Sequence, residues 1–215
     1  MKTLRVQISI AVLTLLLATS ALCVNVTNIT SGGPLYPTIS GALTAALSGD
    51  TLLVRSNVYN ESPDINKNIT IRGGYNPAFT TQDGITIITN GGAAGSVIDV
   101  TGGVYAELER LRLQGGSFGL FGGALDVRAG STAFVINCQL RQSRAARGGG
   151  LYASDTGTLV ILSNSAVSAN LASEAGGGIR AFGGARVIAT GADSDIINNS
   201  APEGGGAAVA DARVK

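Results

Sequence analysis

The stretch GGGLYASDTG, residues 148–157, decides how this chain folds, because its three opening glycines return at even intervals. GGGIRAFGGA begins at Gly176 and GGGAAVADAR at Gly204, so the triplets stand 28 residues apart. A short, even period of this size is typical of repeat proteins, in which each unit buries its apolar face only against its neighbours. Glycine triplets also occur in phosphate-binding loops, but those open a helix, whereas each triplet here opens a strand.

Three sets of aliphatic residues repeat with nearly the same period. Within each set the steps are 26 to 29 residues long. The sets are Ile98, Leu125, Leu151 and Ile179; Leu108, Val135, Ile161 and Ile188; and Leu113, Leu140, Val167 and Ile196. They predict an all-β fold: a parallel β-helix with three faces and about 27 residues per coil. The aliphatic columns would fill its interior, and the glycines would lie at the corners, where a Cβ atom does not fit.

The N-terminal segment has the organisation of an export signal. Lys2 and Arg5 precede the apolar run of residues 8–18, and small residues follow it. Residues 1–23 are therefore interpreted as a signal peptide, after whose removal no membrane-spanning segment is expected. A spanning helix is a poorer interpretation because the apolar run is short. A lipid anchor on Cys23 is disfavoured by the bulky residue before it.

The rest of the chain divides into a cap and a solenoid. Residues 24–50 are interpreted as a polar leader and a capping helix, since Ile39 and Leu43 lie at helical spacing and Gly49 ends the pattern. Residues 51–215 are interpreted as β-helix coils. The sequence stops part-way through a coil, so we expect that the C-terminal end of the solenoid is missing.

Composition excludes several classes of function. The chain has 215 residues, of which 45% are hydrophobic and 13% charged, so it should fold rather than remain disordered. A net charge of +1 gives no basic surface for nucleic acid. The absence of histidine excludes histidine catalysis and histidine metal ligation. Signal cleavage would leave Cys138 without a disulfide partner, as a small buried residue. We expect a monomer.

One outward row is the best candidate site. If Ile98 and its counterparts point inward, the next residue of each strand points outward, which aligns Asp99, Asp126, Tyr152 and Arg180 on successive coils. Two carboxylates one coil apart could share a hard cation such as Ca²⁺, and an aromatic ring followed by a guanidinium could hold a sugar and a uronate. The alternative is that these are solvated outer positions of a solenoid. No dedicated metal site or cofactor is predicted.

A second acidic pair lies near the C-terminus. Asp193 and Asp195 alternate as in a calcium-binding loop, but the other ligands of such a loop are missing, so a turn is the better interpretation.

Two families share motifs with the chain. GGAL at residues 122–125 is similar to the Gly-Gly-Ala-aliphatic motif of polymorphic outer membrane protein repeats, and VSAN (167–170) and IINN (196–199) resemble their Phe-x-x-Asn partner, with Val167 and Ile196 in place of phenylalanine. Residues 38–75 resemble the opening of pectate-lyase-like right-handed β-helices. The resemblance implies a right-handed winding and stacked asparagines at Asn170 and Asn199. It also implies a location outside the cell or at a bacterial outer membrane surface.

These observations favour a secreted or surface-exposed structural β-helix of the adhesion type, without catalysis of its own. Its partners would be glycans or surface proteins. The alternative is a polysaccharide-active lyase or glycoside hydrolase of the same fold, with Asp99, Asp126 and Arg180 as its working residues. In the pectate-lyase-like enzymes, acidic residues hold Ca²⁺ and a basic residue abstracts a proton.

Overall fold

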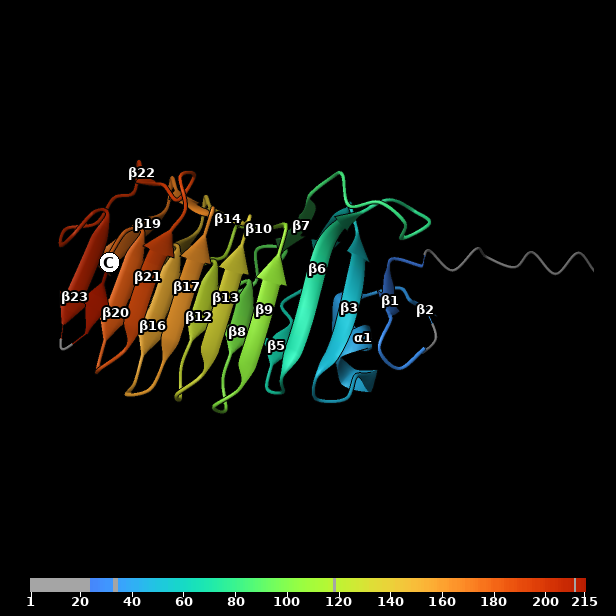
Figure 1. Cartoon of the computed structure of the whole chain (residues 1–215). Helices are drawn as coiled ribbons and strands as arrows, with labels where there is room; N and C mark the ends of the chain where they lie inside the picture. The colour runs from blue at the N-terminus through green and yellow to red at the C-terminus, as the bar shows by residue number, and fades with distance from the viewer. Residues whose placement is uncertain (1–23, 33–34, 118, 211) are drawn as a thin grey trace, which may run out of the picture.

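The protein is a right-handed parallel β-solenoid in the computed structural model, which describes residues 24–32, 35–117, 119–210 and 212–215. In Figure 1 the front strands run upward and successive coils step from right to left, which is a right-handed winding. The predicted fold class is therefore confirmed. The predicted signal peptide, residues 1–23, lies outside the described residues. Within those residues, no helix is long and apolar enough to cross a membrane.

Four sheets, here named A to D, run along the solenoid within the described residues. Sheet A contains β1 (Val26–Asn28), β2 (Leu35–Tyr36), β3 (Asp50–Arg55), β6 (Ile69–Tyr75), β9 (Tyr105–Glu109), β13 (Thr132–Ile136), β17 (Leu159–Ser163), β21 (Arg186–Thr190) and β24 (Arg213–Val214). Sheet B contains β4 (Val58–Asn60), β7 (Thr86–Thr89), β10 (Leu111–Gln114), β14 (Gln139–Arg141), β18 (Ala166–Ser168) and β22 (Ile196–Ile197). Sheet C contains β5 (Asp64–Ile65), β8 (Ile98–Val100), β12 (Leu125–Val127), β16 (Leu151–Ser154), β20 (Ile179–Phe182) and β23 (Ala207–Ala210). Sheet D contains β11 (Gly119–Phe121), β15 (Arg144–Arg147) and β19 (Leu171–Ala175).

Sheet D is a departure from the predicted three strands per coil. The first two coils pass through sheets A, B and C, but the three coils that begin at β9, β13 and β17 also pass through sheet D, between B and C. The strands of sheet D contain glycine, alanine and charged residues, with sequences GLF, RAAR and LASEA. They lack the β-branched run by which strands are recognised, although their backbones pair in parallel like the others.

Two of the three predicted columns fill the core. Leu125 pairs with Ile98 and Leu151, Leu151 with Ile179, and all four side chains are fully buried. The column of Leu113, Leu140, Val167 and Ile196 is also in register.

The column that contained Ile161 and Ile188 was wrong. Val135 pairs with Leu162 rather than Ile161, and Leu162 pairs with Ala189. Leu162 is fully buried, while Ile161 and Ile188 lie on the outer face. The sequence LVILS is aliphatic on both faces of its strand, so alternation could not show which residues point inward.

The N-terminal cap is only partly as predicted. The expected helix is present as α1 (Ile39–Ala45), where the hydroxyl of Thr38 accepts a hydrogen bond from the Gly41 amide. The segment predicted to be a polar leader instead contributes β1, which pairs antiparallel with both β2 and β3. This pairing covers the first edge of sheet A, since an open edge would leave backbone groups unpaired.

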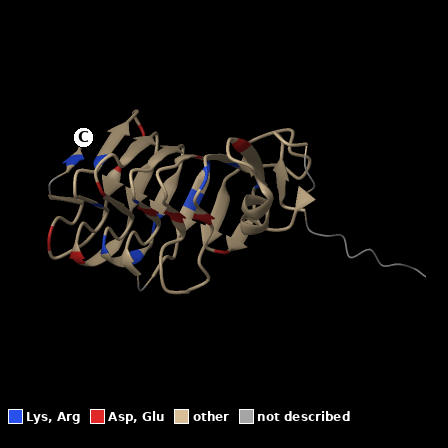
Figure 2. Cartoon of the chain, turned by 90° about the horizontal axis from the view of Figure 1, so that it is seen from below, with Lys and Arg blue, Asp and Glu red and all other residues tan. Residues whose placement is uncertain are grey.

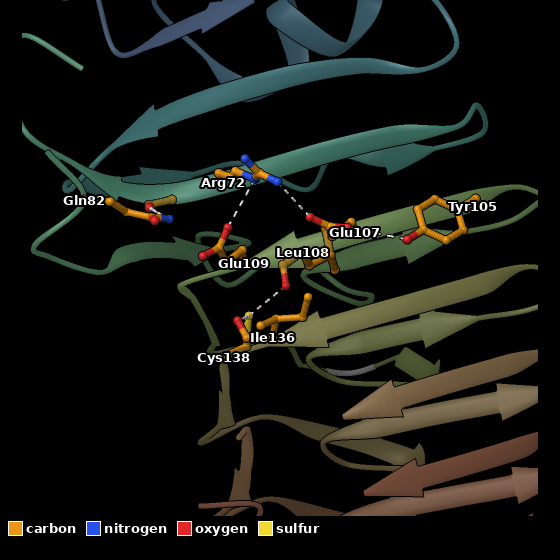
Figure 3. A network of polar contacts seen from close by, with 9 residues as sticks. Arg72, Gln82, Tyr105, Glu107, Leu108, Glu109, Ile136 and Cys138 are labelled. Atoms are coloured by element: carbon orange, nitrogen blue, oxygen red, sulfur yellow. Dashed lines mark hydrogen bonds and ion pairs between the residues drawn. The ribbon is translucent and has the colours of Figure 1, made fainter. Parts of the chain in front are cut away.

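Polar side chains satisfy the backbone at the corners. The predicted stacking of Asn170 and Asn199 is confirmed: the Asn170 amide N–H donates to Oδ1 of Asn199 at 3.0 Å. One coil earlier, the Ser143 amide donates to Oδ1 of Asn170 at 3.0 Å. At another corner the buried Cys138 donates through its sulfur to the Leu108 and Ile136 carbonyls, each at 3.3 Å (Figure 3). Cys138 is therefore a hydrogen-bonded corner residue as well as a small buried one.

Candidate functional site

The predicted outward row exists in the register expected. Asp126 pairs with Asp99 and Tyr152, and Tyr152 pairs with Arg180, on successive strands of sheet C. The residues on either side of Asp126 point into the core and are fully buried. In Figure 2, which views the solenoid from below, acidic positions follow one another on neighbouring strands.

Tight glycine turns cover part of this row. Gly122 connects sheet D to sheet C with φ +49°, and a Cβ atom placed on it would lie 2.8 Å from the Cα and Cβ atoms of Asp126. Gly148 and Gly176 occupy the same position in the next coils, 3.0 Å from the Cα atoms of Tyr152 and Arg180 by the same measure. Because these turns lie directly against the row, Asp126 is only 2% exposed and Tyr152 only 5%. The row points away from the core, yet half of it is buried.

The two carboxylates differ from surface aspartates. Oδ2 of Asp126 lies 3.0 Å from Nε of Arg128, but its Oδ1 is buried without a hydrogen-bond partner. Burial raises the pKa of Asp126 to about 7, with Asp99 adding to the rise and Arg128 opposing it. Burial also raises the pKa of Asp99, against a hydrogen bond from Ser96. Asp126 is therefore partly protonated near neutral pH, which weakens it as a cation ligand.

The other two residues of the row already have partners. The Tyr152 ring packs on Phe121 of sheet D, with centroids 4.5 Å apart, and burial raises the pKa of its phenol. Nη1 of Arg180 lies 3.6 Å from Oε1 of Glu203, and its side chain is 13% exposed. Tyr152 is therefore nearly inaccessible, whereas Nε and Nη1 of Arg180 have no hydrogen-bond partner beside this ion pair.

Sequence reasoning missed two members of the site. Asp64 on β5 pairs with Asp99 and extends the row to three carboxylates. It stands 35 residues before Asp99, because the second coil is longer than the others, so the period of 27 could not find it. Asp64 is exposed and lines an open polar hollow with Thr44 and Lys67. Phe121 was missed because it belongs to sheet D.

No cation site is evident in the part of the chain that the structure describes. No three Asp, Glu or Cys side chains approach one another there as metal ligands, although Asp64, Asp99 and Asp126 share a row. Asp193 and Asp195 lie exposed in the connection between β21 and β22, which confirms that this segment is a turn.

Comparison with known proteins adds no relative: the chain matches no family model, no curated protein and no solved structure.

Proposed function

We propose that this chain is a non-catalytic, secreted or surface-exposed β-solenoid, which displays its outer faces to glycans or protein partners. The observation that carries the proposal is the covering of the row on sheet C. Asp126 and Tyr152 are nearly inaccessible, and Arg180 is engaged by Glu203. Groups that react with a polymer must be accessible to it, whereas these side chains are covered by, or paired with, other residues of the chain.

The location outside the cell rests on the sequence pattern of residues 1–23 and on the resemblance to surface β-helix repeats. The corner hydrogen bonds of Ser143 and Asn170 fit this role, because an extended display scaffold must hold its shape without a disulfide. Within the described residues the cysteine, Cys138, is free, so hydrogen bonds rather than a disulfide hold these coils.

A second candidate is a polysaccharide-active enzyme that works through Asp99, Asp126 and Arg180. It is favoured by one observation: Asp99 and Asp126 are neighbouring carboxyl groups, each with a raised pKa and an unpartnered Oδ1 atom. A protonated carboxyl beside an ionised one is the arrangement used in general acid–base chemistry.

Incubation of the purified chain with acidic polysaccharides, with and without Ca²⁺, tests the two candidates. We expect no new chain ends, and we expect retention of the protein on a glycan array or on cell-surface extracts. Calcium-dependent cleavage that is lost in Asp99→Ala and Asp126→Ala, but kept in the exposed control Asp193→Ala, would establish the enzyme and overturn the proposal. Detection of the chain in the cytoplasm only, after cell fractionation, would overturn the proposed location.

A further inference from the structure

The outer face of sheet A carries a stripe of large apolar side chains. On β13 and β17 the inward residues Ala133, Val135, Val160 and Leu162 are buried, so the residues between them point outward. The apolar stripe consists of Tyr105, Phe134, Ile136, Leu159, Ile161 and Ile188. Each is partly exposed, and Tyr105 is 41% exposed. Figure 1 shows this face toward the viewer, with no helix over it.

The composition of the stripe, rather than its size, distinguishes it from the outer face of an ordinary sheet. The outer positions of a one-sided sheet normally carry polar residues, and a contiguous apolar group marks a contact surface. Tyr105 and Phe134 already pack on each other across neighbouring strands, with ring centroids 5.2 Å apart. The stripe is therefore continuous across β9, β13, β17 and β21.

The two ends of the stripe carry opposite charges. Its central row runs from Glu107 through Phe134, Ile161 and Ile188, and Lys215 follows because Val187 and Val214 are paired. Lys215 is held beside Ile188 by a hydrogen bond from its amide to the Val187 carbonyl at 3.0 Å.

At the first end, Glu107 and Glu109 both pair with Arg72, at 3.4 and 3.2 Å (Figure 3), so this group of two carboxylates and one guanidinium is net negative. At the other end Arg186, Arg213 and Lys215 are all exposed on the same face.

This pattern is complementary to itself. A half-turn about an axis parallel to the strands, through Ile161, lays two copies face to face with antiparallel solenoid axes. It places Ile161 against Ile161, Phe134 against Ile188, and Glu107 against Lys215. A half-turn about an axis that lies between the two faces and parallel to the solenoid axis would instead place Glu107 against Glu107 and Lys215 against Lys215, where like charges repel.

We propose that the apolar stripe of sheet A is the surface on which a second copy of this chain docks, with the two solenoids antiparallel. A contact that pairs a patch with itself is the usual form of a two-fold dimer. The proposal does not depend on the proposed function. It differs from the monomer expected from the sequence, which counted Ile161 and Ile188 among the core residues.

The size of the stripe sets the strength of association. By the spacings of parallel sheets it is about 19 Å long and about 13 Å wide. This is smaller than a standard stable interface, so we expect a weak, reversible dimer rather than an obligate one.

Sedimentation velocity of the full chain over a concentration series tests the association. We expect a reversible monomer–dimer equilibrium. Ile161→Arg should abolish the dimer, whereas the matched control Leu120→Arg, at a 69% exposed residue of sheet D, should keep it. A monomer at every soluble concentration, or a dimer lost in the control and kept in Ile161→Arg, would overturn the proposal. Circular dichroism confirms that both variants fold.

Charge reversal and cross-linking test the arrangement of the two copies. Glu107→Lys and Lys215→Glu should each weaken the dimer about tenfold, and the double variant should recover it. Facing sheets lie about 10 Å apart, too far for a disulfide, so a short bis-maleimide is the suitable reagent. In a Cys23→Ser background, Ile161→Cys should cross-link with itself, and Phe134→Cys should cross-link with Ile188→Cys. Self-cross-linking of Phe134→Cys without the mixed product would refute the antiparallel arrangement.

Discussion

Replacement of Gly148 by alanine should lower the free energy of unfolding through two effects, backbone strain and close packing. A matched control variant separates the two. Gly148 has φ +64°, and a Cβ atom there would lie 2.3 Å from the Leu151 carbonyl oxygen and 3.0 Å from the Tyr152 Cα atom. Gly130 is the matched control, because its φ is +73° but the nearest atom to its Cβ would be the Thr156 carbonyl oxygen at 3.8 Å.

The two variants share one energetic term and differ in another. A left-handed alanine costs about 1–2 kcal/mol, partly offset because alanine lowers the entropy of the unfolded chain by about 0.4–1 kcal/mol. Gly130→Ala should therefore destabilise the protein by about 1 kcal/mol. Gly148→Ala must in addition push a carbonyl aside by about 1 Å, and overpacking of this kind costs about 1–3 kcal/mol. The expected total is about 2–4 kcal/mol.

Urea unfolding followed by far-UV circular dichroism measures this difference, provided that the slope of the transition is the same for both variants. Agreement of the two variants within about 0.5 kcal/mol would refute the reasoning, since the close approach of the turn to sheet C would then cost nothing. Near-UV signals from Tyr152 provide a local check. They should change in Gly148→Ala and stay unchanged in Gly130→Ala, because only the first residue contacts Tyr152.

Three further outcomes are expected. Asn170→Ala should lower the free energy of unfolding by about 2–4 kcal/mol in urea titrations, because the Ser143 amide and the Leu140 carbonyl lose buried partners, and Asn170→Ser should lose less. Cys138→Ser should change the thermal midpoint little, since a serine hydroxyl can replace the thiol as donor to the same two carbonyls; a large loss would contradict this. The pKa of Asp126 is raised from 3.8 to about 7, so its contribution to stability is complete below pH 3.8 and is lost as the pH rises through 7. Unfolding midpoints should therefore fall over this range in the wild type and fall less in Asp126→Asn, and equal slopes would show that Asp126 titrates normally.

The period and the corners of the solenoid could be predicted from sequence because each rests on a local requirement repeated in every coil. A glycine triplet every 28 residues indicates a turn that tolerates no Cβ atom, and the structure places the first glycine of each triplet at positive φ. The aligned residues of sheet C followed from the same period, so the register of Asp99, Asp126, Tyr152 and Arg180 was correct.

The accessibility of those residues could not be predicted in the same way. Whether Asp126 meets solvent depends on Phe121 of sheet D and on the path of the turn at Gly122, which connects sheet D to sheet C. The three strands of sheet D carry no apolar alternation, so nothing in their sequence indicates that they lie beside sheet C.

The sequence by itself determined that the chain repeats, where its corners fall and which residues share a row on sheet C, because identical local demands recur once per coil. Only the tertiary structure decided which face of the aliphatic strand LVILS is the inner one, and hence that Ile161 lies outside. A strand that is apolar on both faces has two registers with similar local preference, and only the close packing of the interior selects between them.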